Sequence, residues 1–170
     1  MYHTDIANCF NQAFLDAYHT RMVGGAAEPL YLPATAEQPA QLFYREDFAA
    51  SALHEAAHWC IAGARRRTQV DFGYAYQPPP RSAQQQQRFF ALEVRTQALE
   101  SLFASAAGVR FQPSADNLGS DIAPFAAQVE AALPQVRSWL QSSKDARAGQ
   151  FLAALVKAAS AQQRIEHGTG

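Results

Sequence analysis

Two histidines four residues apart, His54 and His58, stand in a mostly apolar segment with the sequence LHEAAHW at residues 53–59. Four residues advance an α-helix by about 400°, so a helix here would place both imidazoles about 40° apart on one face. The apolar neighbours of the histidines predict that this helix is largely buried. The chain must therefore fold around a buried histidine-bearing helix, which we expect to run from near Asp47 to about Arg65.

The composition favours one globular domain over residues 1–170, with a frayed tail after about residue 163. Of the 170 residues, 48% are apolar and 17% are charged, which argues against disorder. No apolar run approaches the roughly 18 residues of a membrane helix, and the N-terminus lacks the pattern of a secretory signal. Cys9 and Cys60 are too few for a disulfide framework. We therefore expect a cytoplasmic protein with no membrane partner.

Hydrophobic spacing predicts an α+β fold in which helices pack on a small mixed or antiparallel sheet. Alternation with a period of two is clearest at residues 70–76, which we predict to be a strand. Gly24-Gly25 is expected to separate the first helix from the next element, and Pro134 to break a later helix. The other predicted elements are helices at about 5–18, 82–107, 122–141 and 144–163, strands at 30–32 and 42–44, and a loop at 111–121.

A metal ion held by His54 and His58 needs further ligands. The third histidine of the extended zinc-protease pattern is absent, because position 64 is Ala64. Two histidines and a carboxylate suit a non-haem Fe(II) oxygenase, and they equally suit a zinc hydrolase. Glu55 is rotated by about 100° from His54 and could hold a proton or orient a bound water. The candidate carboxylates downstream are Glu93, Glu100, Asp116 and Asp121.

Positive charge gathers in the middle of the chain. Residues 61–95 contain six arginines against Asp71 and Glu93, a net charge of +4, whereas the whole chain has a net charge of -1. This segment is a candidate surface for an acidic partner, while the overall charge argues against a globally basic nucleic-acid binder. Arg65, Arg66 and Arg67 either dock such a partner or stabilise the end of the histidine helix.

Several segments between about residues 6 and 121 form a specific combination. The longest are EPLYLPA at 28–34, ALHEAAHWCIAG at 52–63 and VDFGY at 70–74. Shorter motifs follow at residues 92–94, 97–99, 106–108 and 114–117. In combination, these segments strongly resemble the bacterial elongation factor P hydroxylase family.

The resemblance implies a metal-dependent enzyme that hydroxylates the β-lysylated lysine of elongation factor P. It implies a fold similar to the metal-dependent ribosome-maturation endoribonucleases, and a metal site of His54, His58 and Glu93. Fe(II) is the expected metal, with zinc or another divalent ion as the alternative, and molecular oxygen is the expected cosubstrate. Glu55 would orient a ligand or relay a proton. Two other functions stay open: a zinc-dependent hydrolase with Glu55 as general base, and a metal-stabilised binding module without turnover.

Overall fold

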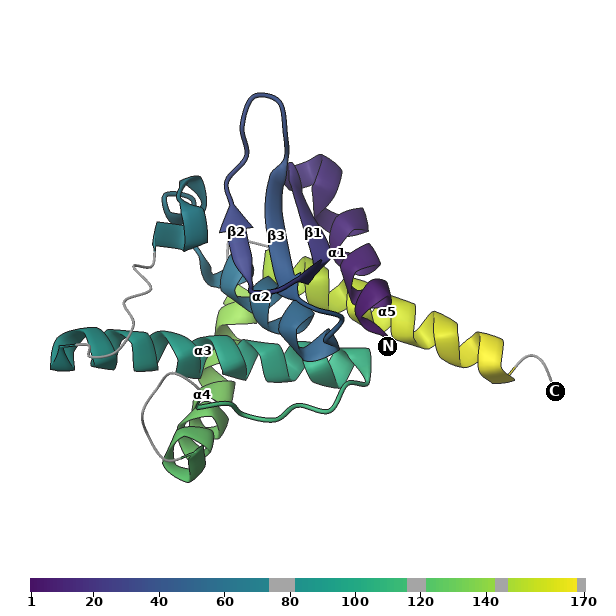
Figure 1. Cartoon of the computed structure of the whole chain (residues 1–170). Helices are drawn as coiled ribbons and strands as arrows, with labels where there is room; N and C mark the ends of the chain where they lie inside the picture. The colour runs from purple at the N-terminus through teal and green to yellow at the C-terminus, as the bar shows by residue number, and fades with distance from the viewer. Residues whose placement is uncertain (74–81, 116–121, 143–146, 168–170) are drawn as a thin grey trace.

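The computed structural model describes residues 1–73, 82–115, 122–142 and 147–167, with side chains described as far as residue 164. Within these residues, five α-helices combine with a three-stranded mixed sheet, which confirms the predicted α+β class (Figure 1). No helix among them is long and apolar enough to cross a membrane. The helices are α1 (His3–Tyr18), α2 (Ala49–Ile61), α3 (Ala83–Ala107), α4 (Ile122–Ser142) and α5 (Arg147–His167), and the strands are β1 (Thr20–Ala26), β2 (Leu30–Leu32) and β3 (Ala40–Arg45).

The sheet has the strand order β1-β3-β2, so β3 lies in the centre. β3 is parallel to β1 and antiparallel to β2. β1 is not predicted from the sequence, because Gly24-Gly25 suggests a break where the strand in fact continues. The pairing register of β1 shifts between Val23 and Ala26, and Gly25 there has a φ of 80°. Gly24 admits the Tyr44 side chain, because a Cβ at that position would collide with the Tyr44 hydroxyl.

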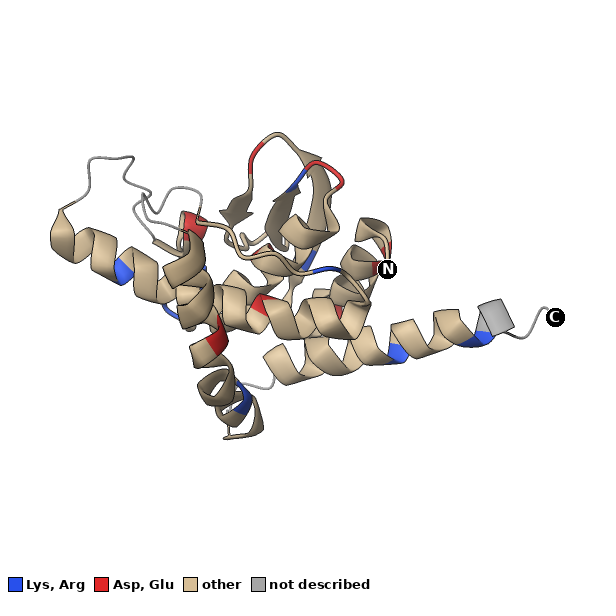
Figure 2. Ribbon diagram, turned by 90° about the horizontal axis from the view of Figure 1, so that it is seen from below, with Lys and Arg blue, Asp and Glu red and all other residues tan. Residues whose placement is uncertain are grey.

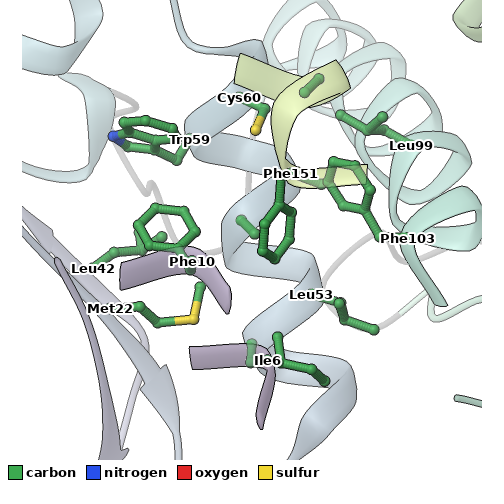
Figure 3. Close-up of a cluster of buried hydrophobic side chains, with 14 of the residues drawn as sticks. Ile6, Phe10, Met22, Leu42, Leu53, Trp59, Cys60, Leu99, Phe103 and Phe151 are labelled. Atoms are coloured by element: carbon green, nitrogen blue, oxygen red, sulfur yellow. The ribbon is translucent and has the colours of Figure 1, made fainter. Parts of the chain in front are cut away.

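Helix α2 runs through the middle of the hydrophobic core, where side chains from the sheet and three helices surround it (Figure 3). Its alanines at positions 52, 56 and 57 are fully buried, and their small size lets neighbouring elements approach closely. Trp59 fills the space towards α1, with its ring 5.1 Å from that of Phe10. The surrounding core residues labelled in Figure 3 are Ile6 and Phe10 of α1, Met22 and Leu42 of the sheet, Leu99 and Phe103 of α3, and Phe151 of α5.

The helix ends at Ile61 and not at Arg65 as predicted. Ala62 is extended, and a short 3-10 helix at Arg66–Thr68 follows. The terminal carbonyls of α2 are taken up by arginines. Arg147, which is 1% exposed, donates to the carbonyl oxygens of Cys60 at 3.2 Å and Ala62 at 2.9 Å, and its guanidinium lies 4.6 Å from the centre of the Trp59 ring. α5 thus holds the end of α2 in place.

The predicted strand at 70–76 is wrong where the structure describes it. Val70–Gly73 forms a 3-10 turn in which Asp71 and Phe72 have positive φ values of 48° and 58°. The apolar residue at position 72 is buried in this turn and not in a strand. Phe72 stacks on Tyr31, with ring centres 4.3 Å apart. Asp71 accepts a hydrogen bond from the Tyr31 N–H at 2.9 Å. Residues 74–76 lie outside the described residues.

α3 begins and ends close to the predicted positions 82 and 107, and local hydrogen bonds and a glycine explain both ends. Ser82 accepts a hydrogen bond from the Gln85 N–H, the Gln85 side chain accepts one from the Ser82 N–H, and Gly108 closes the helix with a φ of 65°. Pro134, in contrast, does not break α4, which continues through it to Ser142. Proline removes one backbone hydrogen bond, and the helix-forming residues on both sides maintain the helix. α5 extends to His167, beyond its predicted end.

Candidate metal centre

A stripe of polar side chains runs along the inner face of α3. Residues 93, 96, 97 and 100 follow the i, i+3, i+4, i+7 spacing, which places them on one side of a helix. All four are buried, although a buried position normally favours apolar residues. Buried polar groups need partners, and those of Glu93, Thr96 and Glu100 include the histidines of α2. The stripe consists of Glu93, Thr96, Gln97 and Glu100, which are 8%, 0%, 4% and 7% exposed.

His54 and His58 face this stripe from α2, and their Nε2 atoms lie 3.0 Å apart. Glu93 approaches both rings, with one carboxylate oxygen 3.2 Å from His58 Nε2 and the other 3.7 Å from His54 Nε2. The three side chains can each offer one ligand atom within 4.8 Å of the others. Two nitrogens bound to one ion at about 2.1 Å each would have a separation of this size. The donor set therefore fits a divalent metal ion.

Glu100, another of the candidate third ligands, lies on the other edge of the His54 ring. Its carboxylate oxygen is 2.8 Å from His54 Nδ1, whereas Glu93 faces the Nε2 atoms. The two buried carboxylates of α3 thus contact opposite nitrogens of one imidazole. The remaining candidates, Asp116 and Asp121, lie outside the described residues.

Gln97 connects the metal centre to the segment that follows α3. Its amide forms a pair of hydrogen bonds with the backbone of Ser114, donating to the carbonyl oxygen at 2.8 Å and accepting from the N–H at 3.0 Å. The same amide nitrogen lies 3.5 Å from a Glu93 carboxylate oxygen. One side chain therefore fixes residue 114 next to the helix and borders the Glu93 carboxylate.

The charged groups of the site raise the pKa of His54 and lower the pKa of Glu93. Burial would lower the pKa of His54, but the hydrogen bond and charge of Glu100, followed by the charges of Glu93 and Glu55, raise it to about 10. Burial would raise the pKa of Glu93, but the hydrogen bond and charge of His58, with the charge of His54 and the amide of Gln97, lower it to about 2. At neutral pH the metal-free site therefore holds a cationic imidazole against an anionic carboxylate.

Glu55 lies on α2 directly after His54 and is half-buried. Burial raises the pKa of its carboxyl group, the charges of His54 and His58 oppose this, and the charges of Glu93 and Asp71 add to it. A carboxyl group with a raised pKa beside a metal centre can take up or release a proton more readily than an exposed glutamate.

The three arginines after α2 differ in their surroundings. Arg67 donates to the carbonyl oxygen of Ala62, and Arg66 donates to that of Phe72 at 3.1 Å. These two side chains hold the segment from α2 to the 3-10 turn. Arg65 is exposed. In the described part of the chain, the other charged residues are spread over several helices and loops (Figure 2).

The group of His54, His58 and Glu93 that the resemblance implies lies together in the structure, whereas sequence analysis includes Glu100 only as one of several possible ligands. It misses Arg147 altogether, because an arginine at the start of a helix resembles a surface residue. The spacing of Glu100, seven residues after Glu93 with Gln97 between them, is the signal that could have placed it on the same buried face.

The chain matches the protein family described as "Elongation factor P hydroxylase" over residues 9–167. It is 43% identical over 165 residues to a protein of Haemophilus influenzae named "Elongation factor P lysine hydroxylase", an alignment that covers 95% of this chain and 91% of the relative. The chain therefore belongs to the elongation factor P hydroxylase family. The match includes α4 and α5, where the sequence alone offers no diagnostic motif.

The metal-free protein should lose stability as the pH rises from about 6.5 towards 10. The ordinary pKa of a histidine side chain is 6.5, and that of His54 in the folded protein is about 10. Its contribution to stability is therefore fully present below pH 6.5 and is lost as the pH rises through the folded value. One proton gives a slope of at most about 1.4 kcal/mol per pH unit. Glu93 acts in the acid range, where its contribution is present above pH 4.5 and is lost as the pH falls towards 2.

Urea denaturation in the presence of a chelator at pH 5.5, 7.5 and 9.5 measures this effect. His54→Gln is the matched control, because glutamine does not titrate in this range. The free energy of unfolding should fall more steeply with rising pH in the wild type than in His54→Gln. Identical pH profiles would show that the folded protein does not hold a cationic His54.

Proposed function

We propose that the chain is a metal-dependent hydroxylase that acts on the β-lysylated lysine of elongation factor P. The Haemophilus influenzae relative is named for lysine hydroxylation of that factor, and the identity extends over nearly the whole of both chains. The structural observation that carries the proposal is the convergence of His54, His58 and Glu93 on one point. The expected cytoplasmic location and the likeness of the fold to the endoribonucleases stay predictions.

His54 and His58 would hold the metal ion through Nε2, and Glu93 would hold it through its carboxylate. We propose Fe(II), because two imidazoles and one carboxylate form the donor set of non-haem iron oxygenases. Bound Fe(II) would supply the activation of molecular oxygen, of which one atom would enter the C–H bond and the other would leave as water with two electrons from an external reductant. The His54 side chain is 26% exposed, whereas those of His58 and Glu93 are 13% and 11% exposed. A substrate side chain would therefore approach from the His54 side.

Glu55 would act through its carboxylate, which is next to the ligand His54 and has a raised pKa. In the hydroxylase it would orient a neighbouring polar group or hold a proton during turnover. The same position also suits the general base of an H-E-x-x-H zinc hydrolase, which is the second candidate function. The two functions differ in how much they need the Glu55 carboxylate.

Substitution of a metal ligand should abolish both metal binding and hydroxylation. His54→Ala, His58→Ala and Glu93→Ala each remove one donor from the group of three. We expect stoichiometric Fe(II) binding to be lost in the histidine variants, with far-UV circular dichroism close to that of the wild type. The intact mass of β-lysylated elongation factor P should rise by one oxygen with the Fe(II)-loaded wild type in air and an added two-electron reductant, and not under anaerobic conditions.

Full metal occupancy in both histidine variants would contradict the proposed site. If the wild type binds metal and elongation factor P but never changes the mass of the factor, the chain is a binding module.

Glu55→Gln separates the hydroxylase from the hydrolase. Loss of a general base typically lowers the rate of a hydrolase by about 10²–10⁴-fold. In the hydroxylase the Glu55 carboxylate is not a metal ligand, so measurable hydroxylation should remain, which mass spectrometry of the substrate can follow. Zinc-dependent peptide cleavage without oxygen uptake, lost in Glu55→Gln, would support the hydrolase.

We also propose that Arg65, Arg66 and Arg67 form part of the docking surface for an acidic face of elongation factor P. They follow the metal-bearing helix directly, so attraction for an acidic protein would be focused near the site. Arg66 and Arg67 also donate to backbone carbonyls, and their replacement would disturb the chain after α2. Arg65 is therefore the position at which docking can be tested without this second effect.

Arg65→Gln should raise the apparent KM for modified elongation factor P by about two- to fivefold at low salt, because an exposed charge acts mainly on association. The difference from the wild type should shrink as ionic strength rises, with metal content unchanged. Arg164→Gln is the matched control, since Arg164 lies near the far end of α5 (Figure 1). Equal kinetics for Arg65→Gln and the wild type at every salt concentration would refute the docking role of Arg65.

A further inference from the structure

We infer that Glu100 is a positioning residue that fixes the orientation of His54 and keeps its Nε2 directed at the metal centre. The inference rests on the proposed metal-dependent function of the site, and it assigns Glu100 a role different from that of Glu93. Its starting point is a contact in the interior: the Glu100 carboxylate oxygen lies 2.8 Å from His54 Nδ1.

The contact with Glu100 determines which nitrogen of the His54 ring carries the hydrogen atom. An ionised carboxylate only accepts hydrogen bonds, so Nδ1 of His54 must be the donor. A metal ion binds the neutral imidazole, which carries one N–H and has its lone pair on the other nitrogen. With Nδ1 protonated, that nitrogen is Nε2, which lies 3.0 Å from His58 Nε2 and 3.7 Å from Glu93. Glu100 thereby selects the form of His54 that can donate an electron pair at the metal centre.

The geometry of α3 explains why two glutamates perform different tasks. Residues 93 and 100 are two turns apart, or about 10.5 Å along the helix axis. Both side chains are directed at α2, so one reaches the Nε2 edge of the His54 ring and the other its Nδ1 edge. A carboxylate at Nδ1 lies across the ring from a metal bound at Nε2. Glu100 is therefore not the third ligand in this arrangement.

His54 also needs this support more than His58 does. Its side chain is 26% exposed, compared with 13% for His58, so packing restrains it less. The two supports come from the same stripe of α3, since Thr96 Oγ1 lies 3.5 Å from His58 Nδ1. A carboxylate that orients a metal-bound histidine typically contributes about 10–100-fold in metal affinity.

The inference can be tested with full-length protein and zinc, without any measurement of activity. A competition titration against a chromophoric chelator gives the affinity and stoichiometry of zinc for the wild type, Glu100→Ala, Glu100→Gln and Glu93→Gln. Glu130→Gln is the matched control, because Glu130 is an exposed glutamate on α4. Glu100→Ala should bind one zinc about 10–100-fold more weakly than the wild type. Glu100→Gln should recover part of that loss, because its amide oxygen can accept the same hydrogen bond, and Glu93→Gln should lose more than either.

Nuclear magnetic resonance of the zinc-loaded protein supplies a signature that a merely structural role would not change. The Nδ1 proton of His54 should be protected from exchange in the wild type and in Glu100→Gln, and it should exchange rapidly in Glu100→Ala. Wild-type zinc affinity in Glu100→Ala, or an unchanged Nδ1 proton, would overturn the inference. Complete loss of zinc in Glu100→Ala, together with retention in Glu93→Gln, would instead make Glu100 the ligand and also overturn it. If zinc binding follows the expected pattern but elongation factor P is never hydroxylated, the proposed function fails and the role of Glu100 stands.

Discussion

The contact between the histidines of α2 and the buried carboxylates of α3 is the interaction on which the site depends. Burying Glu93 and Glu100 without partners would cost several kcal/mol, and His54 and His58 offset this cost where α3 packs with this face inward. The same pairing directs the imidazole Nε2 atoms and the Glu93 carboxylate towards one point. The same side chains therefore form both the contact between α2 and α3 and the proposed set of metal ligands.

The core supplies the rigidity that this arrangement requires. α2 is buried among α1, the sheet, α3 and α5, and Arg147 of α5 holds its terminal carbonyls (Figure 3). Ligands on packed helices keep their geometry better than ligands on loops. Gln97 also holds Ser114 in place through a pair of hydrogen bonds, and its amide nitrogen lies beside the Glu93 carboxylate. The conformation of the chain after α3 is thus coupled to the position of a proposed ligand.

Features that depend on residues within one helix could be predicted from the sequence, whereas features that depend on contacts between distant segments could not. The spacing of His54 and His58 and the predicted range of 82–107 for α3 depend on local patterns, and the structure agrees with both. The strand predicted at 70–76 was wrong because Phe72 turns inward in a left-handed conformation to stack on Tyr31, a residue far away in the sequence. That Glu93 and Glu100 meet opposite edges of the His54 ring likewise could not be predicted from the sequence, because it depends on how α2 and α3 pack.

The metal-free site is arranged so that metal binding would require little rearrangement. Glu100 accepts the Nδ1 hydrogen of His54, and that hydrogen bond can persist whether Nε2 carries a proton or a metal ion. Glu93 already faces both Nε2 atoms, and its negative charge lies beside the cationic His54. A divalent ion at this point would replace the proton on Nε2 as the partner of Glu93, so binding would release that proton and strengthen as the pH rises. The charges that keep α2 and α3 together without metal are therefore the same charges that would hold the ion.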